Sequence, residues 1–278
     1  MGPVDAWAPQ LFRWLGLGAA LVAAVLYLRL FARDAAAEVR LRRGLLWAAV
    51  VAISVSLIWR TVELGTVPLL TPSEALYFYG WLVFLVYLTL MRSPTQALVG
   101  ALLVPFGAIC VLLGAVTFPA ETTVLPIFQS PLFAVHTLSA FLGYSALSVA
   151  CCAGILYLVL HDQVVHKRMG GLFRRLPPLE DLDQLGFRTV LLGFLLLTVA
   201  IGVGAAWARS EWGVSWILEP KAVWALVSWA VYAVYLVVRG SRGWRGKRAA
   251  WLATAGFALS IAGFLGTNYW LASGRHVF

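Results

Sequence analysis

The sequence predicts an all-α, polytopic membrane protein with about eight transmembrane helices and with both termini on the outer, non-cytoplasmic side of the membrane. Two features of its composition predict this class: 62% of the 278 residues are hydrophobic, and only 12% are charged. A soluble domain cannot bury so much apolar surface, so lipid must cover part of it. In addition, the apolar residues form runs of about 20, the length that a helix needs to cross a bilayer.

Eight runs reach this length, at residues 11–31, 44–62, 73–91, 96–117, 132–160, 188–208, 221–238 and 249–272. We expect the first run to be a genuine span rather than a cleavable signal peptide, because basic residues follow it instead of preceding it. The third begins after Pro72, where Ser73 and Glu74 suit a helix start better than a chemical role. The longest gap, 161–187, is expected to be a short charged loop, so residues 1–278 are predicted to form a single domain.

The basic residues sort between the two membrane faces that these spans define. Five of the 21 Lys and Arg residues fall on one face: Arg13, Arg60, Arg209, Lys221 and Arg275. The other sixteen follow the first, third, fifth and seventh spans: Arg29, Arg33, Arg40, Arg42, Arg43, Arg92, Lys167, Arg168, Arg174, Arg175, Arg188, Arg239, Arg242, Arg245, Lys247 and Arg248. The positive-inside rule makes the richer face cytoplasmic. The net charge of +9 therefore reflects membrane topology, with lipid as the partner, and does not indicate nucleic-acid binding.

The cysteines exclude two redox classes. Cys110, Cys151 and Cys152 all lie inside apolar spans, and none belongs to a Cys-x-x-Cys or Cys-x-x-Cys-His motif. The chain is therefore expected to be neither a thioredoxin-like reductant nor itself a c-type cytochrome. We interpret the three thiols as small apolar packing groups.

Two of the four histidines are expected at the outer membrane face. His136 lies near the outer end of the fifth span, and His276 follows the outer end of the eighth, whereas His161 and His166 belong to a cytoplasmic loop. Imidazole is a frequent axial ligand of haem iron, and two histidines on opposite sides of a macrocycle would hold it. A capping or interfacial role for each histidine is the alternative.

A tryptophan-rich segment joins the sixth and seventh spans on the same face. Five of the 13 tryptophans lie within 23 residues: Trp207, Trp212, Trp216, Trp224 and Trp229. A single tryptophan there is typical of the aromatic belt at a membrane interface. Five together exceed that need, and indole faces suit stacking on a porphyrin. Three cationic side chains of this face could pair with anionic groups such as haem propionates: Arg209, Lys221 and Arg275.

These residues resemble a known family, the haem-handling cytochrome c assembly proteins of the CcsA/ResC type, with the related HemX-like proteins. The resemblance covers about residues 60 to 278 and has four supports: PLLTPSEALYFYGW, LPIFQSPLFAVHTLSAFLGYSAL, WGVSWILEPKAVWAL and GTNYWLASGRHVF. The third is similar to the family's signature W-G-x-x-W-x-W-D-P-K-E, a WWD-like motif, and the fourth to its closing G-x-N…G-x-H. The chain departs from the signature at Leu218, Glu219 and Ala222, which stand where the family has Trp, Asp and Glu.

The resemblance implies a non-covalent b-type haem at the periplasmic or extracellular face of the bacterial inner membrane. By position, His136 and His276 would be the axial iron ligands, and residues 207–224 an external haem-binding loop. The implied lining residues are Trp212, Gly213, Trp216, Glu219, Pro220, Lys221 and Trp224, with Arg209 and Arg275 nearby. No catalytic side chain is implied. The chain would be a non-catalytic or haem-presenting part of a cytochrome c synthase, with a CcsB/ResB-type protein and apocytochrome c as partners.

Two other functions are compatible with the same spans. A HemX-like accessory or regulatory protein of haem biosynthesis would share the scaffold; the altered signature favours it, and the two retained histidines disfavour it. A small-solute transporter would treat the histidines and tryptophans as interface residues. No span looks broken by paired glycine and proline at mid-membrane and no inverted repeat is apparent, which disfavours transport.

Overall fold

Helices are the only regular secondary structure in the described part of the chain, which confirms the predicted class. The computed structural model describes residues 7–31, 39–90, 97–119, 122–167, 170, 173, 176–212 and 220–266. The helices are α1 (Ala8–Leu28), α2 (Val39–Leu64), α3 (Pro72–Leu90), α4 (Ala97–Val116), α5 (Pro131–Val165), α6 (Leu179–Trp212), α7 (Pro220–Ser241) and α8 (Lys247–Leu265), with short 3₁₀ turns η1 (Arg29–Phe31) and η4 (Pro126–Gln129).

Seven of the described helices, α1 to α7, are long and apolar enough to cross a membrane. The protein is therefore a multi-pass membrane protein. The predicted eighth span, 249–272, continues beyond the described residues, and only its first part is seen, as α8. A total of eight spans with both termini outside stays a prediction.

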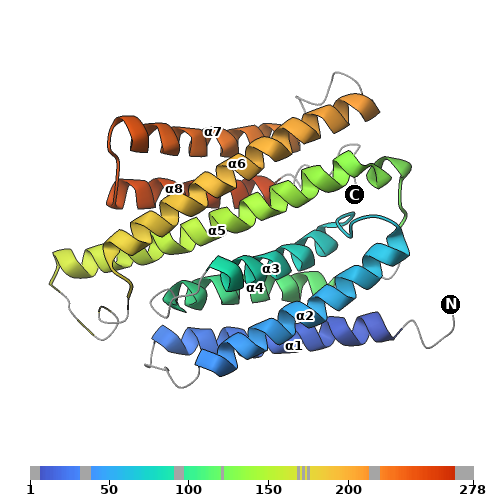
Figure 1. Cartoon of the computed structure of the whole chain (residues 1–278), viewed down its shortest axis with the longest axis horizontal. Coiled ribbons are helices and arrows are strands. Elements are labelled where there is room, and N and C mark those ends of the chain that lie inside the picture. The colour runs from blue at the N-terminus through green and yellow to red at the C-terminus, as the bar shows by residue number, and fades with distance from the viewer. Residues whose placement is uncertain are drawn as a thin grey trace. The chain divides into compact units, whose positions relative to one another are not determined.

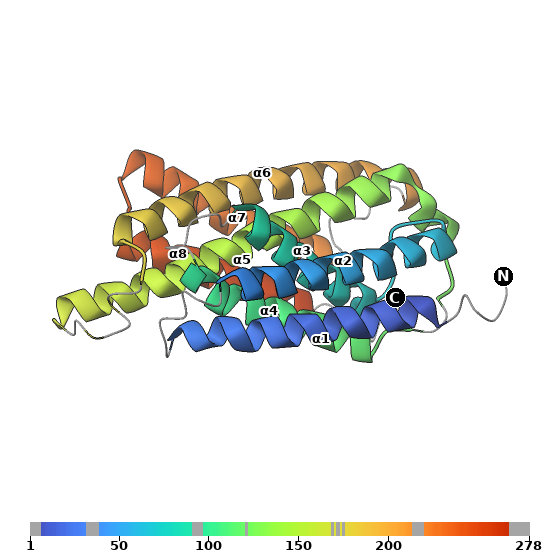
Figure 2. The ribbon, with the colours of Figure 1, turned by 60° about the horizontal axis from the view of Figure 1, so that its bottom comes forward.

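The helices group into two compact units, Met1–Gln129 and Ser130–Phe278, called here the N-terminal and C-terminal units. In the N-terminal unit, α1 packs against α2 and α4, and α3 packs against α4. Figures 1 and 2 show α1 and α2 side by side over most of their length. Glycine allows the closest approach: a Cβ on Gly80 of α3 would lie 2.6 Å from the carbonyl oxygen of Gly107 in α4. Small residues at such crossings are the usual basis of helix packing in lipid.

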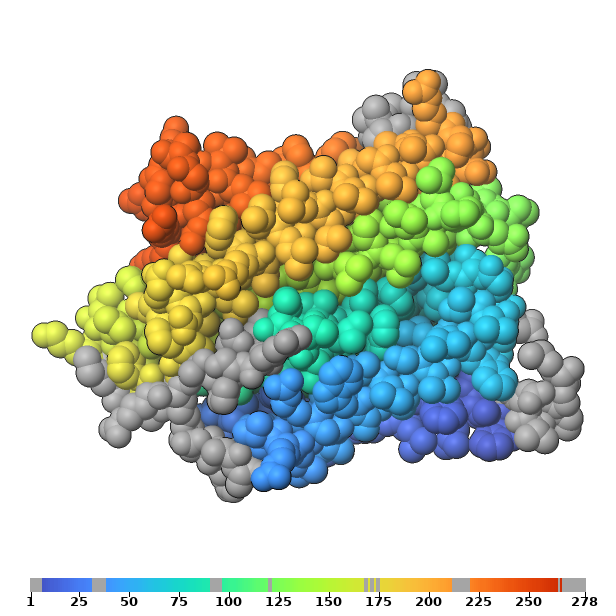
Figure 3. Space-filling view, in the orientation of Figure 1, coloured from blue at the N-terminus to red at the C-terminus, as the bar shows by residue number. Residues whose placement is uncertain are grey.

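In the C-terminal unit, α5 is the central helix. It packs along α6 and against α8, and α7 packs on α8 (Figure 1). Where α5 and α6 cross, a Cβ on Gly193 would lie 3.0 Å from the carbonyl oxygen of Gly143. Figure 3 shows α6 as an uncovered ridge of side chains along this unit. Its exposed leucines, Leu191, Leu192 and Leu195, are the surface that lipid is expected to cover.

Two helices are longer than the hydropathy pattern predicts. α5 extends to Val165 and α6 begins at Leu179, so the predicted charged loop 161–187 is wrong in extent. The physical reason is that a helix satisfies its own backbone hydrogen bonds in water as well as in lipid. A drop in hydropathy therefore marks the end of the membrane core and not the end of the helix.

Candidate functional site

His136 lies in the second turn of α5, at a well-defined helix start. Ser130 is the N-cap and its side chain accepts a hydrogen bond from the Leu132 N–H at 3.3 Å, while Pro131 occupies the first helical position. Both features are typical of helix N-termini. The helix-start signals in the sequence SPLFAVH thus place His136 in the second turn of the helix.

The His136 ring is held against α6. Its Nδ1 lies 2.8 Å from the backbone oxygen of Ala200, and its ring stacks on Trp207 with centroids 6.3 Å apart and planes at 20°. Trp207 is only 6% exposed, and Phe133 of α5 packs on it at 5.3 Å. Among the described residues, the other ring nitrogen, Nε2, has no hydrogen-bond partner. One nitrogen is therefore engaged by the protein and the other is available to a ligand.

The tryptophan-rich segment is largely helical where it is described. Residues 207–212 complete α6, and residues 220–224 open α7 with Pro220 at its first position, so the predicted loop 207–224 is shorter than expected. Arg209 and Lys221 have exposed side chains at these two helix ends. Figure 1 shows the end of α6, the start of α7 and the start of α5 at the same end of the C-terminal unit.

Three tryptophans of this segment have described side chains, and each packs against a neighbouring helix. Trp224 packs on α8, where a Cβ on Gly263 would lie 3.0 Å from its indole. Trp229 donates a hydrogen bond from Nε1 to Thr198 Oγ1 at 2.9 Å and stacks on Phe194 at 5.2 Å. With Trp207 buried beneath His136, these three indoles position helices α5 to α8.

Several predicted site residues lie outside the described part of the chain. These are Gly213, Trp216, Glu219, Arg275 and His276, together with the side chains of Trp212 and Pro220. The convergence of His136 and His276 on one iron stays a prediction. Within the described ranges, no group of three or more His, Cys, Asp or Glu side chains could hold a metal ion by itself.

A buried polar cluster in the N-terminal unit escaped the sequence analysis. Glu74 is fully buried and accepts hydrogen bonds from Arg60 Nε at 3.0 Å and from the Leu70 N–H at 3.1 Å. Thr71 Oγ1 accepts from the Glu74 N–H at 3.2 Å, so Thr71 is the N-cap of α3. The expected place of Glu74 in the first turn of this helix is confirmed, whereas the cap is Thr71 and not Ser73. The ion pair with Arg60 was missed, although a carboxylate buried among apolar spans indicates a counter-charge.

Arg60 is the centre of this cluster. Besides Glu74, it donates to Thr122 Oγ1 at 2.8 Å and pairs with Glu63 at 3.3 Å. Its guanidinium also lies 5.6 Å from the Phe118 ring centroid. One side chain thus ties α2 to α3 and to the segment after α4, which makes the cluster a structural clamp.

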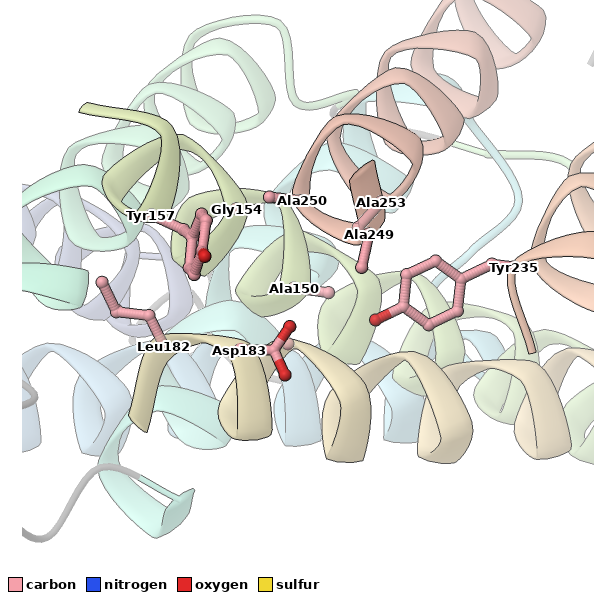
Figure 4. Close-up of a pocket in the computed structure, with 10 residues that line it drawn as sticks. Ala150, Gly154, Tyr157, Leu182, Asp183, Tyr235, Ala249, Ala250 and Ala253 are labelled. Carbon is pink, nitrogen blue, oxygen red and sulfur yellow. The ribbon is translucent and has the colours of Figure 1, made fainter. Parts of the chain in front are cut away.

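In the C-terminal unit, another ion pair joins α6 to α7 at the end away from His136. Asp183 of α6 accepts two hydrogen bonds from the Arg239 guanidinium of α7 and one from the Gly246 N–H at 2.9 Å. Figure 4 shows Asp183 with Tyr157 and Tyr235 around a small cavity whose other lining residues are mostly alanine and glycine. Its volume of about 10 Å³ is at the lower limit for one water molecule, so it cannot hold an organic ligand.

Comparison with known proteins identifies the family. The sequence model of a family described as "Cytochrome C assembly protein" matches residues 69–273. The chain belongs to this family. The resemblance inferred from the four sequence motifs is thereby confirmed. The matched residues include α3 to α8, with the cap at Thr71, His136 and the tryptophan-rich segment.

Individual relatives agree with the family. A protein named cytochrome c biogenesis protein CcsA from Guillardia theta is 32% identical, with 83% of this chain and 82% of the relative covered. Its counterpart from Synechococcus sp. (strain RCC307) is 33% identical over the same shares. One from Parasynechococcus marenigrum (strain WH8102) is 31% identical over 95% of both chains. The alignments thus cover 82% to 95% of the length of these CcsA proteins.

Proposed function

We propose that this protein works in cytochrome c biogenesis by binding haem at the external membrane face and presenting it to apocytochrome c. Its family and its CcsA-named relatives support the role in biogenesis. The same relatives give no support to the HemX-like role in haem synthesis.

The seating of His136 is the observation that carries the haem-binding part of the proposal. Its ring is fixed by Ala200 and Trp207, and Nε2 is left without a protein partner among the described residues. A metal-binding histidine commonly engages its second nitrogen with a backbone carbonyl in this way. A merely interfacial histidine would not need a rigid ring with one free nitrogen. The donor on this chain therefore fits haem iron.

The remaining roles follow from position in the chain. His276 would be the second axial ligand, and residues from the end of α6 to the first turns of α7 would line the haem: Trp212, Gly213, Trp216, Glu219, Pro220, Lys221 and Trp224. Arg209 and Arg275 would pair with the propionates. The haem is cargo, held without a covalent bond, and its vinyl groups react with the thiols of apocytochrome c. The protein contributes ligation and orientation, so no catalytic side chain is required. A CcsB/ResB-type protein would complete the complex in the bacterial plasma membrane.

The absorption spectrum of the purified full-length protein in mild detergent tests haem binding. The parent protein is expected to carry a Soret band, and both His136→Ala and His276→Ala are expected to lose or shift it. His166→Ala is the matched control, because that exposed histidine lies at the other end of α5. A parent without haem, or a band unchanged in both outer-face variants, contradicts the proposal.

Thiol labelling in intact cells tests the side on which the haem would lie. Glu211→Cys and Ser241→Cys place thiols at exposed positions near the end of α6 and at the end of α7. An impermeant maleimide is expected to label position 211 and not position 241. The native thiols are buried or half-buried, which keeps the background low. The opposite labelling pattern would reverse the orientation.

A further inference from the structure

One face of α6 forms the seat of His136. Ala200, Gly204 and Trp207 follow one another at helical spacing, so they lie on the same side of the helix. Ala200 contributes its carbonyl oxygen, Trp207 contributes its ring face, and Gly204 lies between them beneath the imidazole. The contact of Gly204 with the ring is the feature that the proposed function does not use.

The hydrogen bond to Ala200 defines the protonation of the neutral ring. A carbonyl oxygen can only accept, so Nδ1 must carry the proton. The oxygen has two lone pairs and can accept this bond beside its helical one. In the neutral imidazole, Nε2 then carries the lone pair that binds a metal.

Gly204 makes this contact possible because it has no side chain. A Cβ at this position would lie 2.5 Å from His136 Nδ1 and 2.7 Å from Cε1, closer than real Cβ contacts. The glycine has no positive φ, so space and not backbone conformation requires it. The ring can reach the Ala200 carbonyl only while this space is open.

We propose that Gly204 and the Ala200 carbonyl are positioning groups that hold His136 in its Nδ1–H tautomer and present Nε2 as the nitrogen that binds iron. The metal-binding half of this statement rests on the proposed function. The tautomer and the requirement for glycine do not, because they follow from contacts within the chain.

Stability measurements test the space requirement without any haem. Gly204→Ala is expected to lower the thermal unfolding midpoint of the full-length protein in detergent. In a His136→Ala background the same substitution is expected to raise it, because alanine favours a helix over glycine once the ring is gone. Gly202→Ala is the matched control: its Cβ would meet nothing within 4 Å, so it should raise the midpoint in both backgrounds. A Gly204→Ala effect of the same sign in both backgrounds overturns the inference.

Nitrogen NMR tests the tautomer. In the ¹⁵N-histidine-labelled, haem-free protein at roughly pH 8.5, where an ordinary imidazole is neutral, His136 is expected to show a protonated Nδ1 and an unprotonated Nε2. A His136→Gln sample assigns the signals. Gly202→Ala should keep this pattern and Gly204→Ala should lose it. An Nε2–H tautomer in the parent protein refutes the inference.

The haem-loaded protein separates this inference from the proposed function. Gly204→Ala is expected to lose the low-spin spectrum of the parent and to regain it on addition of free imidazole. A parent that shows the predicted tautomer but takes up no haem would refute the proposed function and leave the positioning role intact. A parent that binds haem through His136 with the spectrum unaltered in Gly204→Ala would refute the positioning role alone.

Discussion

Removing the negative charge of Glu74 should destabilise the protein far more than removing that of Glu63, although both carboxylates contact Arg60. The Glu74 side chain is fully buried at 3.0 Å from Arg60 Nε, whereas that of Glu63 is 37% exposed at 3.3 Å from Nη1. Glu74→Gln keeps the size of the side chain and leaves the nearly buried guanidinium without its main counter-charge. Breaking a buried ion pair in this way costs about 3–5 kcal/mol.

We expect the lower end of that range, about 3 kcal/mol, because Glu63 and Thr122 still contact the guanidinium. At roughly 2–4 °C for each kcal/mol in a chain of this size, the midpoint should fall by roughly 6–12 °C. Glu63→Gln should cost only about 0.2–1 kcal/mol, as exposed pairs do. Thermal unfolding of the purified variants in one detergent, followed by circular dichroism, measures both.

A double variant tests whether charge is the cause. Arg60→Met combined with Glu74→Gln removes both charges, so it should be more stable than Glu74→Gln alone, because no buried ion remains unpaired. Equal losses for Glu74→Gln and Glu63→Gln would show that burial does not set the strength of the pair. A double variant less stable than Glu74→Gln alone would show that the hydrogen bonds of Arg60, and not the unpaired charge, set the loss of stability.

Two further contacts give predictions with matched controls. Asp183→Asn should lower the free energy of unfolding by about 3 kcal/mol, because it leaves the nearly buried Arg239 without its charge partner. Asp181→Asn, at an exposed position on the same turn, should change the unfolding midpoint little. Similar losses of stability in both variants would contradict the role of the ion pair. Gly80→Ala should destabilise the α3–α4 crossing, whereas Gly44→Ala, whose Cβ meets nothing within 4 Å, should stabilise α2 by about 0.5–1 kcal/mol. Stabilisation by both substitutions would show that the close approach at Gly80 is not needed.

The predicted class and the order of spans agree with the structure because both depend on local properties. A run of about 20 apolar residues must form a helix in lipid, whatever it packs against. The same local reasoning put His136 near the start of a span and assigned Glu74 to a helix start. It failed at the end of α5 and at the start of α6, because these turns are polar and still helical.

The sequence by itself determined that this chain is a multi-pass helical protein and, through its motifs, which family it belongs to. The tertiary structure alone decided that Arg60 neutralises Glu74, that Trp207 is buried under His136, and that Gly204 opens the Ala200 carbonyl to the imidazole. The residues in these contacts lie 14 to 71 positions apart in the sequence and belong to different helices. Hydropathy indicates which segments lie in lipid. Which side chains contact each other depends on which helix faces pack together and on how closely the backbones approach.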